Sequence, residues 1–212
     1  MKSYKVETAD LVEKVYSSIK EMILKGELVP GQKLIQEEMA AHLGVSRTPI
    51  LSAFSKLEKE WLVKSIPRRG FYIYEMSREE KINLFDIRLR LESLGAFKAA
   101  ELGTPKEKKA LLSYVEKNSS KDFSTSSSGF NQHDYEFHRR ITDMSRNVML
   151  STMISSYNIV SLSNQDDRTI DYSRSISDHL AISRAISESD AAKAEGLMRD
   201  HIQTGLDRIQ GV

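Results

Sequence analysis

Hydrophobic residues recur every three or four positions through the first 60 residues of the chain, beginning with Leu11, Val15 and Ile19. This spacing is typical of helices that bury one face. It predicts helices over residues 8–25, 36–43 and 47–60. Two short apolar segments then flank a turn that contains proline and glycine, and they predict a β-hairpin with strands at 62–65 and 71–74. Three helices and a hairpin are the outline of a winged helix-turn-helix domain.

The junction between the second and third helices carries strong turn signals. Gly44 follows the last apolar residue of the second helix and suits the left-handed backbone of a helix C-cap. Ser46 can cap the next helix, and Pro49 lies in its first turn, where a missing N–H costs little. The sequence therefore predicts a tight turn followed by a helix that starts with Arg47 and Thr48, where such a helix enters a DNA groove.

After residue 74 the pattern contains only helical spacing, without the alternation of strands. It predicts helices over residues 78–102, 105–118, 128–145, 147–163, 168–187 and 190–210. The Ser-rich segment 121–129 is either a short linker or a helix N-terminus with a functional surface. The fold class is therefore mostly α, with a winged helix-turn-helix domain at 1–76 and an all-helical bundle at 77–212.

Composition excludes several classes of protein. The chain has no cysteine, which excludes disulfides, thiolate catalysis and thiolate metal sites and fits a reducing compartment. No apolar run approaches the length of about 18 residues that a membrane helix needs. The first residues also lack the apolar run of a signal peptide. We therefore expect a cytoplasmic protein with no membrane span.

The net charge is only +1, so DNA contacts must come from local groups of basic residues. Arg47 and Thr48 are the candidates for contacts to bases or phosphates. Lys33, Arg68 and Arg69 are the candidates for phosphate contacts from outside that helix. Taken alone, each of these residues also fits an ordinary solvated surface position. Their order and spacing together favour binding to double-stranded DNA.

A second group of residues has the composition of a divalent-metal site. Asp134 and His138 are four residues apart and project from one helix face, and a bundle can bring His179 and His201 to the same interior point. These four residues are called the His/Asp cluster below. Zinc and nickel are the first candidates, with manganese and iron as alternatives, and ligand softness does not choose among them. The alternative is that each histidine is a surface residue or a hydrogen-bonded core residue.

Two sets of motifs closely resemble those of one protein family. The first resembles the DNA-binding domain of GntR-family regulators and comprises residues 29–34, 43–50, 57–58 and 67–70. The second resembles the ligand-binding helical domain of the FadR-like branch, called the FCD domain, and comprises Arg88, Leu91, Glu92, Asp134, Phe137, His138, Asn147, His179 and His201. The two sets occur in the family's order and span nearly the whole chain.

The resemblance implies that the His/Asp cluster binds a metal and that Arg88 faces a cavity and grips an anionic effector. The physical basis is the bidentate pairing of a guanidinium with a carboxylate. An exposed helix arginine is the alternative for Arg88. Glu92 is expected to be a structural partner and Asn147 a helix cap. The remaining histidines, His42 and His133, match no ligand position of the family.

The sequence also departs from the family pattern at three places. Leu51 stands where a second arginine is usual in the recognition helix, so we expect operator sequence or affinity to differ from the family norm. Ile35 and Gln36 replace the usual Ser-Glu opening of the second helix. Trp61 replaces a glycine, and we expect it to pack within the protein rather than to contact bases.

The sequence therefore predicts a homodimeric transcription regulator, not an enzyme, whose operator binding responds to a small carboxylate at a divalent metal. One alternative is a regulator that binds an organic anion through Arg88 without a metal. A second is a metal-dependent hydrolase, which lacks an obvious base because Glu136 faces away from Asp134 on a helix. Neither the effector nor the choice between repressor and activator follows from the sequence.

Overall fold

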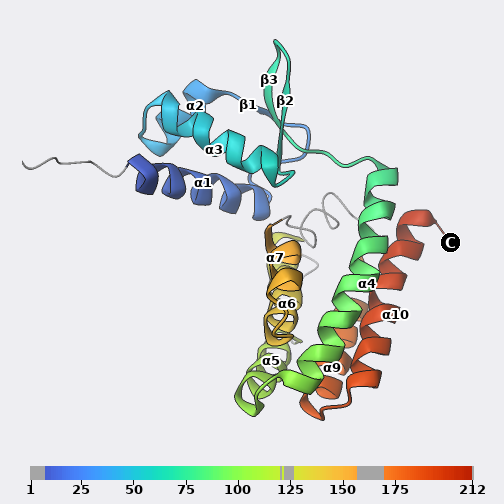
Figure 1. Ribbon diagram of the computed structural model, residues 1–212. Coiled ribbons are helices and arrows are strands. Elements are labelled where there is room, and N and C mark those ends of the chain that lie inside the picture. Colours follow the sequence, from blue (N-terminus) through green and yellow to red (C-terminus); the bar gives the residue numbers. More distant parts are fainter. Residues whose placement is uncertain (1–7, 120, 122–126, 157–169, 212) are drawn as a thin grey trace, which may run out of the picture. The chain divides into compact units, whose positions relative to one another are not determined.

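The computed structural model describes residues 8–119, 121, 127–156 and 170–211 of the chain (Figure 1). The chain divides into two compact units, residues 1–75 and residues 76–212. The prediction of a mostly helical fold with an N-terminal winged helix-turn-helix is confirmed. Each unit is described by itself below.

The first unit contains three helices and a small antiparallel sheet. The helices are α1 (Thr8–Leu24), α2 (Gln36–Leu43) and α3 (Arg47–Lys59), and the strands are β1 (Lys33–Leu34), β2 (Val63–Ile66) and β3 (Gly70–Ile73). The strand order is β1-β3-β2, so the hairpin strand β3 lies in the centre. The predicted hairpin strands are displaced by one residue from the observed ones. The sequence analysis missed β1, because a strand of two residues carries no periodic signal.

Backbone geometry explains the turns of the first unit. Gly44 has φ 66°, and its N–H caps the end of α2 at carbonyls of the preceding turn. Ser46 occupies the predicted N-cap position of α3 with extended backbone, although its side chain makes no capping hydrogen bond. At the tip of the hairpin, Arg68 (φ 64°) and Gly70 (φ 97°) both adopt left-handed backbone. Phe54 and Leu57 are fully buried and anchor α3 in the core.

The described residues of the second unit form helices and short connections, without a strand. Its helices are α4 (Arg78–Leu102), α5 (Pro105–Ser119), α6 (Ser127–Met144), α7 (Val148–Ser156), α9 (Tyr172–Ser187) and α10 (Ala191–Gln210). α4 opens with a reciprocal capping box between Ser77 and Glu80. Residues 157–163 and 168–169, expected to be helical, lie outside the described residues. So does most of the segment 121–129, of which 127–129 form the start of α6.

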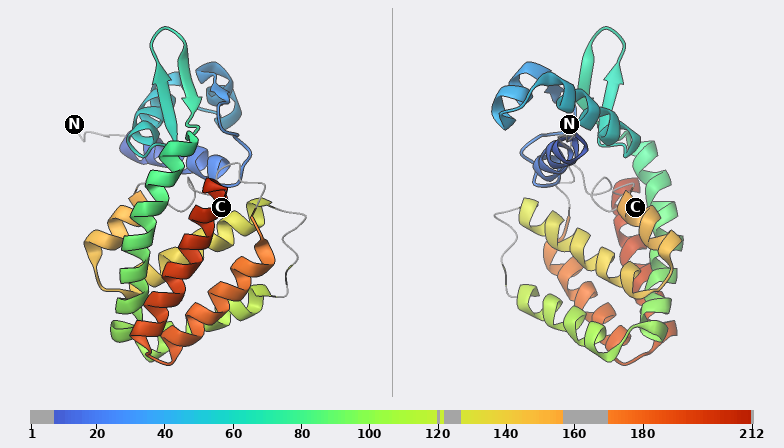
Figure 2. Two further views of the ribbon diagram at one scale, coloured as in Figure 1. Left: turned by 90° about the vertical axis from the view of Figure 1, so that its right-hand side faces the viewer. Right: turned by 60° about the vertical axis from the view of Figure 1, so that its left-hand side comes forward.

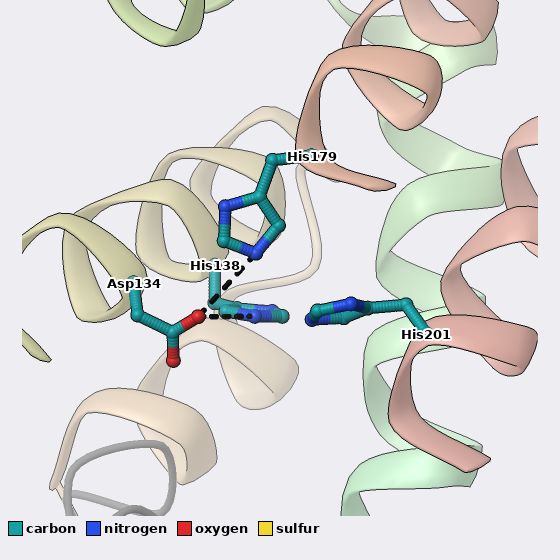
Figure 3. Close-up of side chains that lie close together, drawn as sticks. All are labelled: Asp134, His138, His179 and His201. Carbon is teal, nitrogen blue, oxygen red and sulfur yellow. Dashed lines mark ion pairs between the residues drawn. The ribbon is translucent and has the colours of Figure 1, made fainter. Parts of the chain in front are cut away.

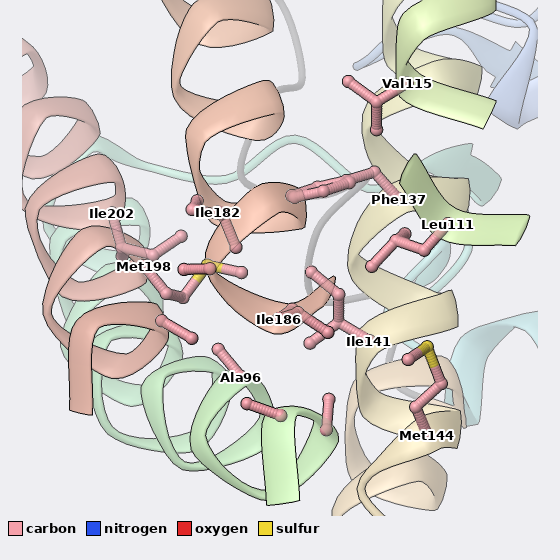
Figure 4. Close-up of a cluster of buried hydrophobic side chains, with 14 of the residues drawn as sticks. Ala96, Leu111, Val115, Phe137, Ile141, Met144, Ile182, Ile186, Met198 and Ile202 are labelled. Atoms are coloured by element: carbon pink, nitrogen blue, oxygen red, sulfur yellow. The ribbon is translucent and has the colours of Figure 1, made fainter. Parts of the chain in front are cut away.

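The core of the second unit joins α4, α5, α6, α9 and α10 (Figure 4). Phe137, Ile141 and Ile182 are fully buried there, and burial of each such side chain contributes about 1.5–3 kcal/mol. α10 runs alongside α4, as both views of Figure 2 show. A Cβ atom at Gly205 of α10 would lie 2.4 Å from Cε1 of Phe85 on α4. Only glycine allows α10 to approach α4 this closely. Phe85 and Gly205 both line the cavity of the site described next.

Candidate metal and effector site

The helical unit brings the whole His/Asp cluster together. Asp134 and His138 come from α6, His179 from α9 and His201 from α10, and each offers a ligand atom within 4.8 Å of the others (Figure 3). Oδ1 of Asp134 lies 3.3 Å from Nε2 of His179 and 3.6 Å from Nε2 of His138. The side chains of His138 and His179 are fully buried, and that of His201 is 10% exposed. Three helices thus converge on one interior point.

Each histidine of the cluster has a second partner on its other ring nitrogen. Nδ1 of His138 contacts a carboxylate oxygen of Glu92 on α4. Nδ1 of His201 lies 3.2 Å from Oδ2 of Asp178. Nδ1 of His179 lies 3.3 Å from Nε2 of His133. Such contacts fix the ring orientation of histidine ligands in metal sites, and here they involve Nδ1 of each ring rather than Nε2.

The donor set fits a divalent transition metal. Nε2 of His179 is buried and forms no hydrogen bond of good geometry among the described residues, although Asp134 lies beside it. A buried polar atom without a partner is costly, and coordination would satisfy it. Three imidazole nitrogens and one carboxylate oxygen suit zinc or nickel, and also iron. The residues present therefore fit the ion that the sequence analysis expected.

The electrostatics of the cluster set its protonation before any metal binds. Burial lowers the pKa of His179 well below its usual value, and it also lowers the pKa of His201. Burial acts in the same direction on His138, but the carboxylates of Glu92 and Asp134 outweigh it and raise its pKa to about 9. Burial acts to raise the pKa of Asp134, but His138 and His179 hold it well below its usual range. In the metal-free protein these shifts favour an ionised Asp134 and a protonated His138, so metal binding would require His138 to release a proton.

Arg88 on α4 lies against the cluster and is 2% exposed, so the alternative of an exposed helix arginine is wrong. Its Nε donates to Oε1 of Glu92 at 2.6 Å. Its Nη2 lies 3.4 Å from Nε2 of His138. A ligand bound to a metal at the cluster would therefore lie next to the side chain of Arg88.

A cavity lies beside the cluster and Arg88, among α4, α6, α9 and α10. It is open to solvent on one side, and the space between its walls amounts to about 460 Å³ when that open mouth is included. Asp134 and His201 line it from the cluster, and Arg88 lines it from α4. The cluster therefore opens toward the same cavity that Arg88 faces, which is the arrangement needed for a small anion to reach both.

Sequence reasoning missed His133. Its side chain is 3% exposed, its ring stacks on Tyr114 at 5.2 Å, and it contacts His179. One signal could have found it: Phe130, His133, Phe137 and Ile141 recur at helical spacing along the buried face of α6. Asp178 was also missed, because nothing in the sequence shows that its carboxylate would lie beside the ring of His201.

The candidate DNA-binding residues all lie exposed on the first unit. Lys33 is on β1, Arg47 and Thr48 begin α3, and Arg68 and Arg69 form the tip of the β2–β3 hairpin. The structure therefore places them on the helix-turn-helix and on the wing, the two parts from which such a domain contacts DNA.

Three neighbouring residues modify this surface. Nη1 of Arg47 pairs with Oε1 of Glu37 on α2 at 3.0 Å. Leu51 is 38% exposed on α3, so an apolar side chain stands where the family pattern has arginine. Trp61 adopts φ 61° and packs edge-on against Tyr74, with ring centroids 5.5 Å apart.

A winged helix-turn-helix unit followed by a helical unit with a cavity beside a buried His/Asp cluster is typical of a class of transcription regulators. Residues 11–73 match the family described as bacterial regulatory proteins, gntR family, and residues 83–204 match the FCD domain. The chain therefore belongs to the GntR family, in its FadR-like branch with a C-terminal FCD domain. This is a family of transcription regulators and not of enzymes, so the prediction of a non-enzyme is confirmed.

Two individual relatives share between a quarter and a third of the matched residues with this chain. The uncharacterized HTH-type transcriptional regulator YdhC of Bacillus subtilis (strain 168) is 29% identical over 148 residues, 68% of this chain and 64% of that protein. The match thus spans less than two thirds of the YdhC length. The Nta operon transcriptional regulator of Aminobacter aminovorans is 28% identical over 184 residues, 85% of each chain.

Solved structures share the fold. E. coli McbR/YncC superimposes with a TM-score of 0.81 at 19% identity, covering 95% of this chain and 97% of that one. A putative GntR regulator from Rhodococcus sp. RHA1 gives a TM-score of 0.79 at 19% identity, covering 95% of this chain and 98% of that one.

Within the described residues, no helix has the length and apolar character needed to cross a membrane.

Proposed function

We propose that this protein is a DNA-binding transcription regulator whose operator binding is controlled by a small carboxylate held at a divalent metal. The observation that carries this proposal is the shared cavity: Asp134 and His201 of the His/Asp cluster line it together with Arg88. A metal ion with open coordination positions supplies positive charge that binds carboxylate oxygens. Arg88 adds a guanidinium whose geometry suits the same group.

Zinc or nickel is the proposed ion. Divalent affinities of nitrogen-rich sites generally rise along the series from manganese through iron to nickel, and imidazole suits zinc and nickel well. The runner-up function, an anion-responsive regulator without a metal, would leave Nε2 of His179 buried 3.3 Å from Oδ1 of Asp134, with no hydrogen bond of good geometry among the described residues. We therefore favour the metal-dependent form.

The first unit supplies the proposed DNA contacts. Arg47 and Thr48 at the start of α3 would reach base edges or phosphates in the major groove. Lys33 on β1 and the wing residues Arg68 and Arg69 would bind phosphates and set the register on the duplex. Exposure of all five side chains supports these roles.

The active form is proposed to be a homodimer, so that two winged units bind two half-sites. Exposed apolar side chains on the helical unit support this: Ile87 and Leu94 lie two turns apart on α4, and Val148, Met149 and Met153 lie on α7. Exposed apolar groups of this kind commonly mark protein interfaces. Sedimentation of the full chain tests it, and a monomer at micromolar concentration would contradict it.

The decisive experiment measures metal and carboxylate binding on the same preparation. Protein purified without chelators should carry about one divalent ion per chain, and metal analysis should lose that ion in His179→Ala. A thermal-shift screen of small carboxylates should show stabilisation with the metal-loaded protein and none with the chelator-treated protein. Anisotropy with DNA from upstream of its own gene should show that His179→Ala still binds DNA. Carboxylate binding that persists in the chelator-treated protein would favour the metal-free alternative.

A further inference from the structure

The cavity beside the His/Asp cluster contains two arginines besides Arg88. Arg174 lines it from α9 and Arg208 lines it from α10. Neither belongs to the motifs that led to the cluster. The cavity therefore holds two cationic groups in addition to the Arg88 guanidinium.

The geometry of α9 and α10 gives the distance of these two arginines from the cluster along the helix axes. α9 and α10 run antiparallel, as two side-chain contacts show: Asp178 contacts His201, and Arg174 contacts Thr204. Arg174 is one turn before Asp178, about 6 Å along the axis, and Arg208 is seven residues after His201, about 10 Å along the axis. Both arginines therefore lie toward the same end of the cavity, one to two turns away from the cluster.

Between the two ends the cavity has apolar walls. Phe85, Phe130 and Ile202 line it together with the charged groups. The guanidinium of Arg88 lies over the ring of Phe85 at 5.0 Å from its centroid. An apolar middle with a cationic group at each end fits a short carbon chain that carries an anion at both termini.

The far end holds the carboxylates of Asp171 and Asp178 as well as the two arginines, and the hydroxyl that Arg174 contacts carries no charge. Nη2 of Arg174 donates to the hydroxyl of Thr204 at 3.1 Å, a neutral partner. Asp171, which also lines the cavity, caps α9 by accepting from the backbone N–H of Arg174, and Asp178 contacts His201. A carboxylate in place of the Thr204 hydroxyl would give Arg174 a charge-assisted hydrogen bond, which is roughly twice as strong as a neutral one.

We propose that the effector is a dicarboxylate, with one carboxylate at the metal and Arg88 and the other bound by Arg174 and Arg208. This inference rests on the proposed function and narrows the class of its effector. A monocarboxylate of the same length fills the apolar middle but leaves the far end without an anion. Arg174 and Arg208 are therefore the residues that select for the second charge.

The test compares matched acids by isothermal titration of the zinc-reconstituted full chain. The probes are succinate against butyrate and glutarate against valerate, pairs that differ in the second carboxylate. We expect at least one dicarboxylate to bind ten times more tightly than its partner acid. The double variant Arg174→Gln/Arg208→Gln should lose this preference and keep its affinity for the monocarboxylates. The control Arg199→Gln changes another α10 arginine, one that pairs with Glu195 and does not line the cavity, and should keep the preference.

The outcomes separate this inference from the function on which it rests. Equal affinities within each pair, with zinc-dependent binding of the monocarboxylates, would overturn the dicarboxylate proposal and leave the regulator proposal standing. Retention of the preference in the double variant would overturn the assignment of Arg174 and Arg208. If no acid of either kind bound the zinc-loaded protein, both proposals would be wrong. Zinc content and circular dichroism of each variant show whether its fold and metal site are intact.

Discussion

Arg88 and Glu92 lie one turn apart on α4 and form a buried ion pair, with 2.6 Å between Nε and Oε1. The other oxygen of Glu92 contacts Nδ1 of His138, a member of the His/Asp cluster. Burial acts to raise the pKa of Glu92, but Arg88 and His138 outweigh it and lower the pKa to about 2. One carboxylate thus orients both the proposed effector arginine and a proposed metal ligand, which links the cluster directly to α4.

Replacing this carboxylate tests the link. We expect Glu92→Gln to destabilise the protein by about 3–5 kcal/mol, because Arg88 keeps a buried charge without its partner. Metal affinity should also fall by about 10- to 100-fold, as for other partners that orient metal ligands. Urea unfolding and metal titration measure the two effects. Glu101→Gln, an exposed change on the same helix, is the control and should leave both unchanged.

His133 gives a second test of how the cluster is oriented. His133→Phe keeps an aromatic ring against Tyr114 but removes the nitrogen that meets Nδ1 of His179. We expect metal affinity to fall by about 10- to 100-fold. His133→Gln retains a polar atom near His179 and should restore part of the affinity. His42→Ala, on the exposed face of α2, should have no effect.

A simple packing role for His133 would give a different pattern. In that case His133→Phe would change stability without changing metal affinity, and Gln would be worse than Phe. Metal affinity from competition with a chromogenic chelator, measured beside thermal unfolding of the metal-free protein, separates the two roles.

Much of the fold was predictable from the sequence because local signals define the ends of its elements. α2 and α4 begin and end at the predicted residues, where Gly44 and the Ser77 capping box stop or start them. β1 was not predictable, because its pairing with β3 is formed by residues far away in the sequence.

The site was predictable only in part for a related physical reason. Asp134 and His138 share one helix face at a spacing of four residues, so their proximity follows from helix geometry. The partners Glu92, His133 and Asp178 depend on how α4, α6, α9 and α10 are rotated against one another. That rotation is set by close packing, such as Gly205 against Phe85, which hydrophobic spacing alone does not encode.

The recognition helix offers a test in the first unit. We expect Arg47→Ala to cost about 1–3 kcal/mol of operator binding and to leave carboxylate binding intact. Leu51→Arg should strengthen DNA binding and steepen its salt dependence, because it adds a phosphate or base contact where Leu51 is exposed. Anisotropy titrations at several salt concentrations measure both. Arg184→Ala, an exposed change on α9, is the control, and equal losses in Arg47→Ala and Arg184→Ala would refute the assignment.

Gly205 controls how closely α10 approaches α4 at the cavity wall. In Gly205→Ala the new Cβ would lie 2.4 Å from the ring of Phe85, so the ring or the helix must move. We expect a loss of about 1–3 kcal/mol in unfolding free energy from this overpacking. Carboxylate binding should weaken as well, because Phe85 lines the cavity and carries the Arg88 guanidinium on its face.

Gly196→Ala is the matched control on the same helix, because nothing lies within 4 Å of its Cβ position. It should stabilise the protein by about 0.5–1 kcal/mol through helix propensity and leave carboxylate binding unchanged. Adding Phe85→Leu to Gly205→Ala relieves the clash, so the two changes together should cost less than the sum of their separate costs. Additive costs would show that Gly205 and Phe85 do not restrain each other, and the wall of the cavity would then have to be held by other contacts between α4 and α10.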